Sequence, residues 1–355
     1  MIKSSASYKR VVVKIGSSIL SYGSQFDIAA LKSLVGQVST LLEKGIEVIL
    51  VSSGAVSSGM SILGLDRRPN KISELQACAS IGQGLLMQNY TSAFLEKEKK
   101  CAQLLLTWDD FSDRGRYLNV KNTLFSLLSY GAVPIINEND TVSSEEIKFG
   151  DNDNLSALVA ILVKADLLII LSDVEGLLDE KGVRIPLVRE ITPQIRKLTS
   201  GTKKAISRGG MLTKLDAAEK AANSGIPCLI ASGAAKDVLN RIVVDKENLG
   251  TVFLPCQKGI CGRKGWIAYS ARSAGKIFVD DGAKEALIKR QKSLLSVGIQ
   301  KIEGSFVKGD IVSILDREEK EFARGSVSCG SKELEIVKGK KHSFEIIHRN
   351  NLAII

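Results

Sequence analysis

The amino-acid sequence predicts an α/β protein, a three-layer α/β/α sandwich with a mainly parallel sheet, followed by a small β-rich domain. Apolar, β-branched runs without polar alternation recur through roughly the first 250 residues, and helical patterns separate them. This combination is typical of parallel strands covered by helices on both faces. After about residue 255, helical patterns become scarce and short β-like runs stand among glycines and charges.

Five apolar runs predict the strands of the first domain. They are residues 10–16, 46–54, 132–137, 166–173 and 226–233. Between the first two runs, residues 27–45 repeat apolar positions at helical spacing and end at Gly45, a residue type that commonly terminates helices. Strands that alternate with helices indicate parallel neighbours joined by crossover connections.

The glycine-rich, basic segment 255–266 predicts the junction between the two domains. We place the first domain at residues 1–257, a linker at 258–273 and the small domain at 274–355. Within the small domain the pattern reads as strand, helix and then further strands. The sequence therefore predicts two cores of unequal size.

Composition places the chain among folded proteins. Its 355 residues are 44% hydrophobic, and its formal net charge of +10 suits an anionic ligand without specifying one. The start of the chain leads directly into a strand pattern, without the apolar stretch of a secretory signal. The longest apolar run is interrupted by Lys164 and Asp166 before it could span a bilayer. We therefore expect a soluble, cytoplasmic protein without membrane contact.

The cysteines are six in number and scattered, with no CxxC spacing, and the chain has only two histidines. Zinc sites and disulfide frameworks need closer and more regular spacing than this. We expect buried or incidental thiols.

Polar loops follow four of the predicted strands. They read KIGSS (14–18), SSGAVSSG (52–59), NEND (137–140) and SDVEG (172–176). The carboxyl ends of parallel strands lie at one edge of the sheet, where ligands of such sheets bind. One polar loop would be unremarkable, whereas four at the same edge predict a site.

Two of these loops have features that suit an anion. Lys14 lies at the end of a buried strand, and Gly16 allows backbone N–H groups to approach a ligand closely. Ser53, Gly54 and Ala55 lead into a predicted helix whose first N–H groups suit a carboxylate or a phosphate. Neither the P-loop pattern nor the dinucleotide GxGxxG fingerprint is present. Taken singly, an exposed strand-end lysine or a plain tight turn would also explain each feature.

A further loop, RGGMLTK (208–214), places Thr213 and Lys214 in the first turn of a predicted helix. A cation there opposes the helix dipole, which a bound phosphate would offset. Two lysines and glycine-rich turns at one edge suit phosphoryl transfer, whose transition state spreads negative charge. The acids and amides of NEND and of GDNDN (150–154) could then bind an ammonium, hold a carboxylate or orient the lysines. One residue of GDNDN is also expected to cap the following helix.

Six motifs, in order, closely resemble the glutamate 5-kinases of the amino-acid kinase family. They are VVVKIGSSIL, VSSGAVSSG, INENDTV, FGDNDNLSALVA, LSDVEGL and GGMLTK. The resemblance covers nearly the whole chain, since the C-terminal part is similar to the PUA domain of many of these kinases. It implies the amino-acid kinase fold and phosphorylation of the γ-carboxylate of L-glutamate by ATP with Mg²⁺, the first step of proline biosynthesis. It also implies feedback inhibition by proline and a homo-oligomer, either a dimer or a tetramer.

The resemblance further implies a role for each matching residue. The catalytic residues would be Lys14 and Lys214, on the transferring phosphoryl group, and Asp153, which orients them. The glutamate site would comprise Ser53, Gly54, Ala55, Asn137, Asp140, Asp151 and Asn152. The nucleotide site would comprise Lys14, Ser172, Asp173, Gly209, Gly210, Met211, Leu212, Thr213 and Lys214. No metal ligand is assigned, because phosphates and water usually hold most of the Mg²⁺ coordination in kinases.

Two alternatives remain open. One is another kinase of the same family, acting on acetylglutamate, aspartate, carbamate or UMP. The other is an RNA-binding protein, which the PUA-like tail and the basic charge suggest. Residues 274–355 hold 15 Lys and Arg against 12 Asp and Glu, and aromatic residues make up only 5% of the chain. We therefore do not expect RNA binding to be the main function.

Overall fold

The computed structural model describes residues 8–22, 25–142, 152–199, 210–256, 263–269, 271–340 and 344–355. The chain divides into two compact units. Unit 1 consists of Met1–Thr107 and Asn119–Gly259, and unit 2 consists of Trp108–Leu118 and Ile260–Ile355.

Unit 1 is built on an eight-stranded sheet in the order β5-β6-β4-β1-β7-β9-β10-β8. The strands are β1 (Arg10–Ile15), β4 (Glu47–Ser52), β5 (Lys100–Leu106), β6 (Ala132–Glu138), β7 (Leu167–Ser172), β8 (Leu187–Val188), β9 (Cys228–Ser232) and β10 (Gly250–Phe253). All neighbours are parallel except β9 and β10. The five predicted strands are confirmed. The sequence did not predict β5, whose residues KCAQLLL include no β-branched side chain.

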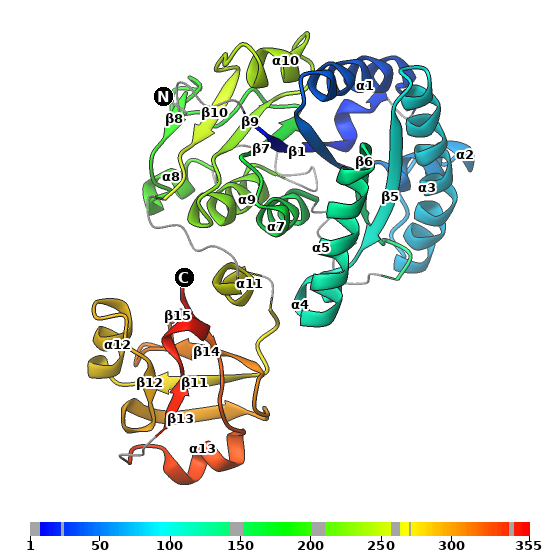
Figure 1. Cartoon of the computed structure of the whole chain (residues 1–355). Helices are drawn as coiled ribbons and strands as arrows, with labels where there is room; N and C mark the ends of the chain where they lie inside the picture. The colour runs from blue at the N-terminus through cyan, green and yellow to red at the C-terminus, as the bar shows by residue number, and fades with distance from the viewer. Residues whose placement is uncertain are drawn as a thin grey trace. The chain divides into compact units, whose positions relative to one another are not determined.

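Helices cover both faces of this sheet. The helices that follow its strands are α1 (Ile28–Glu43), α2 (Ala55–Ile62), α3 (Ile72–Leu95), α5 (Arg114–Ser129), α7 (Asn152–Val163), α8 (Pro193–Lys197), α9 (Met211–Asn223) and α10 (Val238–Val243). Figure 1 shows α1 and α10 on one face and α7 and α9 on the other. A short 3-10 helix, η1 (Ser17–Ile19), and the strand pair β2 (Ser21–Tyr22) and β3 (Gln25–Phe26) lie between β1 and α1.

The central strand β1 shows why its sequence lacks alternation. Val11, Val12 and Val13 are all fully buried. Val11 and Val13 belong to the core that α1, α3 and α10 complete, whereas successive side chains of a strand point to opposite faces, so Val12 faces the α7 side. The middle of a strand that is buried on both faces has no position for a polar side chain. The polar residues of β1 therefore stand near its two ends, at Arg10 and Lys14. The three-layer prediction is confirmed.

Unit 2 contains a five-stranded sheet in the order β13-β11-β14-β15-β17 and a two-stranded sheet of β12 and β16. The strands are β11 (Gly275–Val279), β12 (Leu294–Leu295), β13 (Ile299–Gly304), β14 (Ile311–Leu315), β15 (Glu321–Ser326), β16 (Glu345–Ile347) and β17 (Leu352–Ile354). The helices are α4 (Trp108–Ser112), α11 (Arg263–Tyr269), α12 (Asp281–Ile288) and α13 (Ser331–Val337), and two 3-10 turns, η2 (Ser296–Gly298) and η3 (Arg349–Asn351), complete the unit. Among the described strands of this unit, β11 and β14 pair in parallel and the other pairs are antiparallel.

The stretch that the sequence predicts as a linker, 258–273, contains the helix α11. Trp266 and Ile267 on this helix are buried, and α11 packs against β15 and β17. The Trp266 indole N–H also donates a hydrogen bond to the Phe111 carbonyl oxygen, 2.8 Å away within unit 2. The sequence pattern did not indicate this helix, because glycines and charged residues flank its buried apolar residues.

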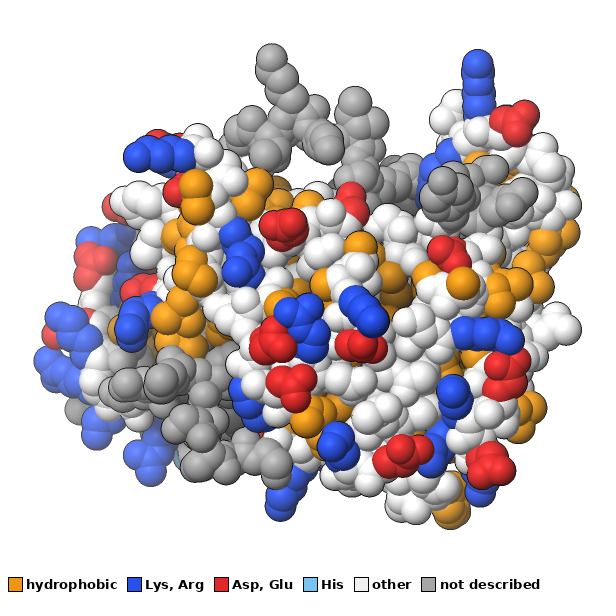
Figure 2. All heavy atoms as spheres, turned by 90° about the horizontal axis from the view of Figure 1, so that it is seen from above, with side chains coloured by type: hydrophobic (Ala, Val, Ile, Leu, Met, Phe, Trp, Pro, Cys, Tyr) orange, Lys and Arg blue, Asp and Glu red, His pale blue; other side chains and the backbone are white. Residues whose placement is uncertain are grey.

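The surface charges of unit 1 are mixed on the side where α1 and α10 lie. Viewed from that side, Lys and Arg side chains are interspersed with Asp and Glu (Figure 2). Ion pairs such as Lys32 with Glu96 and Arg241 with Glu247 illustrate this mixture. The net positive charge is therefore not gathered into one patch on this face. Among the described helices, none combines the length and apolar character needed to cross a membrane.

Candidate active site

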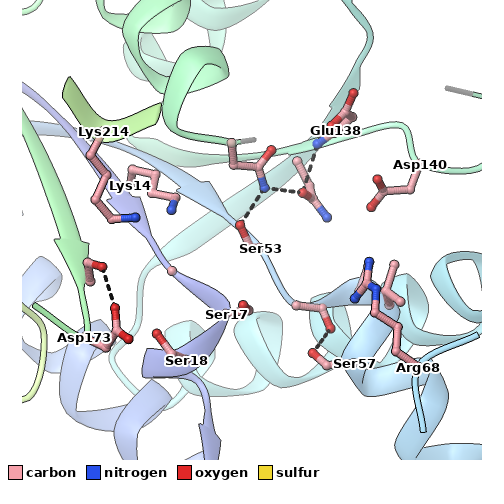
Figure 3. A pocket seen from close by; sticks show the side chains of 17 residues that line it. Lys14, Ser17, Ser18, Ser53, Ser57, Arg68, Glu138, Asp140, Asp173 and Lys214 are labelled. Atoms are coloured by element: carbon pink, nitrogen blue, oxygen red, sulfur yellow. Dashed lines mark hydrogen bonds between the residues drawn. The ribbon is translucent and has the colours of Figure 1, made fainter. Parts of the chain in front are cut away.

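A cavity opens at the carboxyl edge of the unit 1 sheet (Figure 3). Its lining residues come from the ends of β1, β4, β6 and β7, from η1, from the first turns of α2, α7 and α9, and from the connection between α2 and α3. They are Lys14, Gly16, Ser17, Ser18, Ser53, Gly54, Ala55, Val56, Ser57, Arg68, Asn137, Glu138, Asp140, Asn152, Ser172, Asp173 and Lys214. The four polar loops that the sequence places at this edge therefore do converge.

Two lysines meet one carboxylate at one end of the cavity. Lys14 Nζ lies 2.6 Å from Asp153 Oδ1, and Lys214 Nζ lies 3.3 Å from Asp153 Oδ2. Lys14 belongs to β1, Asp153 to the first turn of α7 and Lys214 to the first turn of α9. Asp153 is fully buried, and the two lysines are 6% and 5% exposed. Three elements far apart in sequence thus build one charged cluster with a net charge of +1.

Burial by itself would raise the pKa of Asp153, because a carboxylate loses its hydration inside the protein. The Lys14 and Lys214 ammonium groups, with hydrogen bonds from Lys14 and Thr213, outweigh this effect and hold the pKa of Asp153 below its ordinary value. Asp153 is therefore ionised at neutral pH. An ionised carboxylate between the two ammonium groups fixes their positions and offsets part of their mutual repulsion.

The start of α9 adds neutral donors to this end. Gly210 precedes the helix and has no side chain to cap it, and N–H groups in the first turn of a helix suit an anion. Thr213 Oγ1 lies 3.0 Å from Asp153 Oδ2 and 2.9 Å from the Gly210 carbonyl oxygen. The sequence predicts that a bound phosphate offsets the charge of Lys214 at this helix start. Asp153 offsets part of that charge, because it is shared with Lys14, and the cluster keeps a net charge of +1 that suits an anion.

A chain of neutral amides leads from this cluster toward the other end. Asn152 Nδ2 donates to Ser53 Oγ at 2.7 Å, to Asn137 Oδ1 at 2.9 Å and to the Ser52 carbonyl oxygen at 3.1 Å. Asn137 Nδ2 donates to Gln83 Oε1 on α3, 2.8 Å away. These acceptors fix which end of the Asn152 amide is the nitrogen. Within the described part of the chain, Asn152 Oδ1 is buried and has no hydrogen-bond partner.

Ser52 and Ser53, adjacent at the end of β4, have different surroundings. Ser53 lines the cavity, whereas Ser52 is buried and its hydroxyl lies 2.9 Å from the Tyr90 hydroxyl on α3. Burial raises the pKa of Tyr90 well above its ordinary value, so the phenol stays neutral. The Ser52–Tyr90 contact therefore ties the end of β4 to α3.

Two glycines allow α2 to approach α3 closely. A Cβ atom on Gly82 would lie 1.9 Å from the Ala55 carbonyl oxygen, and one on Gly59 would lie 1.8 Å from the Cys78 carbonyl oxygen. No side chain fits at either position, so the two helices pack backbone to backbone. Gly54, directly before α2, has a φ of +122°, which other residues rarely adopt. This packing holds Gly54 and Ala55 at the wall of the cavity.

The end of β7 lies at the same end of the cavity as the lysines (Figure 3). Ser172 Oγ donates to Asp173 Oδ1 at 2.9 Å, and both residues line the cavity. On the neighbouring strand end, the Gly16 N–H donates to the Leu171 carbonyl oxygen at 3.1 Å, which continues the pairing of β1 with β7 one residue beyond β1.

The structure brings most of the predicted site residues to this cavity, but not all of them. Gly210, Met211, Leu212 and Thr213 lie at the start of α9 without lining the cavity. The fully buried Asp153 does not line it either, but it contacts the two lysines that do. Asp151 and Gly209 lie outside the described residues, and so does part of the GDNDN segment in which a helix cap was expected.

Six further lining residues lie inside the polar loops that the sequence predicts at this edge, although the resemblance implies no role for them. They are Gly16, Ser17, Ser18, Val56, Ser57 and Glu138. Arg68 is different, since it lies in the connection between α2 and α3 and no motif marks it. Gln83 also escaped prediction, because it acts from the middle of a helix.

The acidic lining residues Glu138, Asp140 and Asp173 do not form a metal cage. Among the described residues, no group of three or more His, Cys, Asp or Glu side chains is placed to hold a metal ion. Asp153, the most buried carboxylate, is held by the two lysines. This donor set suits a metal ion that arrives with phosphate oxygens and water rather than one bound by protein alone.

Comparison with known protein families identifies two domains in this chain. The model of the amino acid kinase family matches residues 9–232, and the model of the PUA domain matches residues 275–349. This chain belongs to the amino acid kinase family. The match covers the whole sheet edge that forms the cavity, and the PUA match lies within unit 2.

Relatives of this amino acid kinase align along its full length. It is 47% identical to a glutamate 5-kinase of Thermoanaerobacter sp. (strain X514), over 98% of both chains. It is 44% identical to a glutamate 5-kinase of Geobacter sulfurreducens, again over 98% of both. The solved structure of an N-acetylglutamate synthase from Neisseria gonorrhoeae matches 70% of this chain and 60% of its own, with a TM-score of 0.50 and 15% identity. That likeness concerns the fold alone.

Proposed function

We propose that this kinase is a glutamate 5-kinase, which transfers the γ-phosphoryl group of ATP to the γ-carboxylate of L-glutamate. The products are ADP and L-glutamate 5-phosphate, and the reaction is the first step of proline biosynthesis. The observation that carries the proposal is the buried Lys14–Asp153–Lys214 cluster beside a cavity lined by amides and acids. The full-length relatives named glutamate 5-kinase support the choice of substrate.

The chemistry needs no general base. A side-chain carboxylate is already ionised at neutral pH, so one of its oxygens can attack the γ-phosphorus directly. The bond between that phosphorus and the oxygen bridging to the β-phosphorus breaks, and ADP leaves with the electron pair. The main obstacle is repulsion between an anionic nucleophile and a polyanionic donor.

Lys14 and Lys214 would reduce this repulsion. Their ammonium groups lie where negative charge builds up on the transferring group, in a site shielded from water, where such interactions are stronger than in solution. Asp153 holds both in place before the substrates arrive, so little reorganisation is needed during the reaction. The first N–H groups of α9 add neutral donors to the same region.

The opposite end of the cavity would bind the amino-acid part of glutamate. We assign Ser53, Asn137 and Asn152 to hold the substrate, with Gly54 and Ala55 at the helix start and Asp140 on the α-ammonium group. Asp151, which lies outside the described residues, keeps its proposed place in this site. The amide chain that locks Asn152 to Ser53 and Asn137 preorganises this part of the site.

ATP would lie across the lysine end. We assign Lys14, Ser172 and Asp173, with the segment from Gly209 to Lys214, to the nucleotide. Mg²⁺ bound to the phosphates would neutralise part of their charge. The acids and serines of the cavity are consistent with an ion held largely by phosphate oxygens and water.

Three finer features belong to the same proposal. We infer inhibition by proline, a dimeric or tetrameric assembly and a cytoplasmic location. All three rest on the resemblance to glutamate 5-kinases.

A coupled assay of ADP release with L-glutamate, with and without proline, tests this proposal. We expect glutamate-dependent turnover, and we expect Lys14→Ala and Lys214→Ala each to lower kcat by about 10³-fold, because each removes a charge from the transition state. Lys44→Ala, an exposed lysine on the opposite edge, is the control and should leave kcat unchanged. Turnover with UMP or acetylglutamate but not glutamate would refute the substrate assignment, and unchanged kcat in both lysine variants would refute the mechanism.

A further inference from the structure

Three cations line the cavity among the described residues, and they fall into two groups. Lys14 and Lys214 lie together at one end, where Asp153 pairs with both. Arg68 comes from the connection between α2 and α3, and Figure 3 shows its side chain at the opposite end, on the same side as Asp140. The cavity therefore has a cationic group at each end, with the amide chain between them.

Glutamate carries a matching pattern of charges. Its γ-carboxylate must face the lysines for phosphoryl transfer, so its α-carboxylate and α-ammonium groups point to the other end. Glu138 and Asp140 are anionic there and suit the ammonium group, but they repel a carboxylate. A charged donor is needed at this end to balance the second carboxylate.

The neutral donors at this end are largely committed. The two protons of Asn152 Nδ2 serve three acceptors of the protein itself, and Asn137 Nδ2 donates to Gln83. The N–H groups at the start of α2 line the cavity, but they carry no full charge. Arg68 is the cationic side chain that lines this end among the described residues, and a guanidinium has five N–H donors, so it can hold a carboxylate while it keeps other contacts.

We propose that Arg68 binds the α-carboxylate of the amino-acid substrate and thereby selects α-amino dicarboxylates over simpler γ-carboxylates. This inference rests on the proposed glutamate 5-kinase function. Arg68 is exposed, so water screens its charge and the contribution to binding should be modest. We expect about a 10- to 30-fold effect, in the range of charge-assisted hydrogen bonds at partly solvated sites.

Substrate analogues separate this role from a structural one. Glutarate keeps both carboxylates of glutamate and lacks the ammonium group, whereas 4-aminobutyrate keeps the ammonium group and lacks the α-carboxylate. A residue that binds the α-carboxylate must affect glutamate and glutarate, but not 4-aminobutyrate. A residue that only supports the loop must affect all three.

The experiment measures KM for glutamate and the competitive Ki of glutarate and of 4-aminobutyrate in full-length wild type, Arg68→Ala, Arg68→Lys and Arg67→Ala. Arg67 is the matched control, because it is the neighbouring exposed arginine and does not line the cavity. We expect Arg68→Ala to raise KM and the glutarate Ki by about 10- to 30-fold, with kcat and the 4-aminobutyrate Ki unchanged. Arg68→Lys should restore part of the loss, and Arg67→Ala should behave as wild type.

The inference is overturned if KM is unchanged in Arg68→Ala, if all three constants rise together, or if Arg67→Ala has the same effect. Failure of the underlying function looks different, since wild type itself would then show no turnover of glutamate.

Discussion

The two ends of the cavity are built in opposite ways. The lysine end is buried, charged and supplied by the central strand β1 and two helix starts, with Asp153 fully buried and Lys14 only 6% exposed. At the other end Asp140 is half-buried and Arg68 is exposed, and both lie on connections between elements. The end that would carry the chemistry is fixed by the sheet, whereas the end that would recognise the substrate depends on loops. We expect changes at the first end to affect kcat and changes at the second to affect KM.

The energetics of the two ends differ for the same reason. A buried charge is unfavourable unless it is paired, and removing one partner of a buried pair is more harmful than never having built it. At the exposed end water screens charges and dampens each change. A graded series of substitutions should therefore show a falling effect from Asp153 outward.

Asp153→Asn should give the largest effect. The amide has nearly the same shape but no charge, so two buried ammonium groups are left without a counter-ion. We expect the free energy of unfolding to fall by about 3 kcal/mol and kcat to fall by about 10²-fold. Asp166→Asn is the control, because Asp166 accepts hydrogen bonds from the Lys9 and Arg10 N–H groups where β1 begins. It should leave kcat unchanged. Equal kcat in Asp153→Asn and wild type would show that the carboxylate does not organise the lysines.

The pH dependence of the unfolding free energy of wild type and Asp153→Asn gives a second test. The folded-state pKa of Asp153 lies below its ordinary value of 3.8, so the carboxylate stabilises the folded state fully above that value. This stabilisation is lost as the pH falls through the lower, folded-state pKa. The difference in unfolding free energy between wild type and Asp153→Asn should thus be constant from about pH 5 to 8 and shrink below about pH 4. A difference that shrinks near neutral pH would contradict the assignment.

Gly82→Ala should have an intermediate effect, because it acts on the wall between the two ends. The added Cβ would lie 1.9 Å from the Ala55 carbonyl oxygen and 2.3 Å from the Gly59 nitrogen, so α2 must move away from α3. We expect a loss of about 1–3 kcal/mol of stability and a fall of about 10-fold in kcat/KM as Gly54 and Ala55 shift.

The matched control lies two residues along the same helix. A Cβ on Gly84 would meet no atom within 4 Å, and alanine stabilises a helix interior by about 0.5–1 kcal/mol relative to glycine. Gly84→Ala should therefore be neutral or slightly stabilising in a denaturant titration, with kcat/KM unchanged. Equal stability of the two variants would show that the close approach of α2 and α3 is not needed.

How far the sequence could predict the site follows the same division. Lys14 and Lys214 were predictable as cations of one site, because parallel strands bring the polar loops at their ends to one edge whatever the details of packing. The choice of Asp153 among the acids of that edge came from the resemblance alone. Gln83 and Gly82 were not predictable, since their roles depend on how α3 packs against β6 and α2. The residues next to them in the sequence do not indicate that packing. Arg68 lay in a connection without any motif.

The fold was predictable to a similar degree. Runs of buried valine, leucine and isoleucine marked the central strands, whereas β5 at the edge of the sheet and the two-residue β8 lacked that signal. The segment Trp108–Leu118 belongs with unit 2 through contacts such as that of Phe111 with Trp266. A pairing across so many residues leaves no local pattern, so only the folded chain reveals it.

Gln83→Leu should have the smallest effect of the three and should fall on KM. Leucine fills a similar volume but cannot accept the hydrogen bond from Asn137 Nδ2, which leaves a buried donor unsatisfied at a cost of about 1–3 kcal/mol. Asn137 then holds Asn152 less firmly, and we expect KM for glutamate to rise about 3- to 10-fold with kcat within about twofold of wild type. Gln88→Leu, an exposed position on the same helix, should leave both constants unchanged. A fall in kcat with KM intact would mean that the amide chain serves the lysine end instead, and the division between the two ends would have to be abandoned.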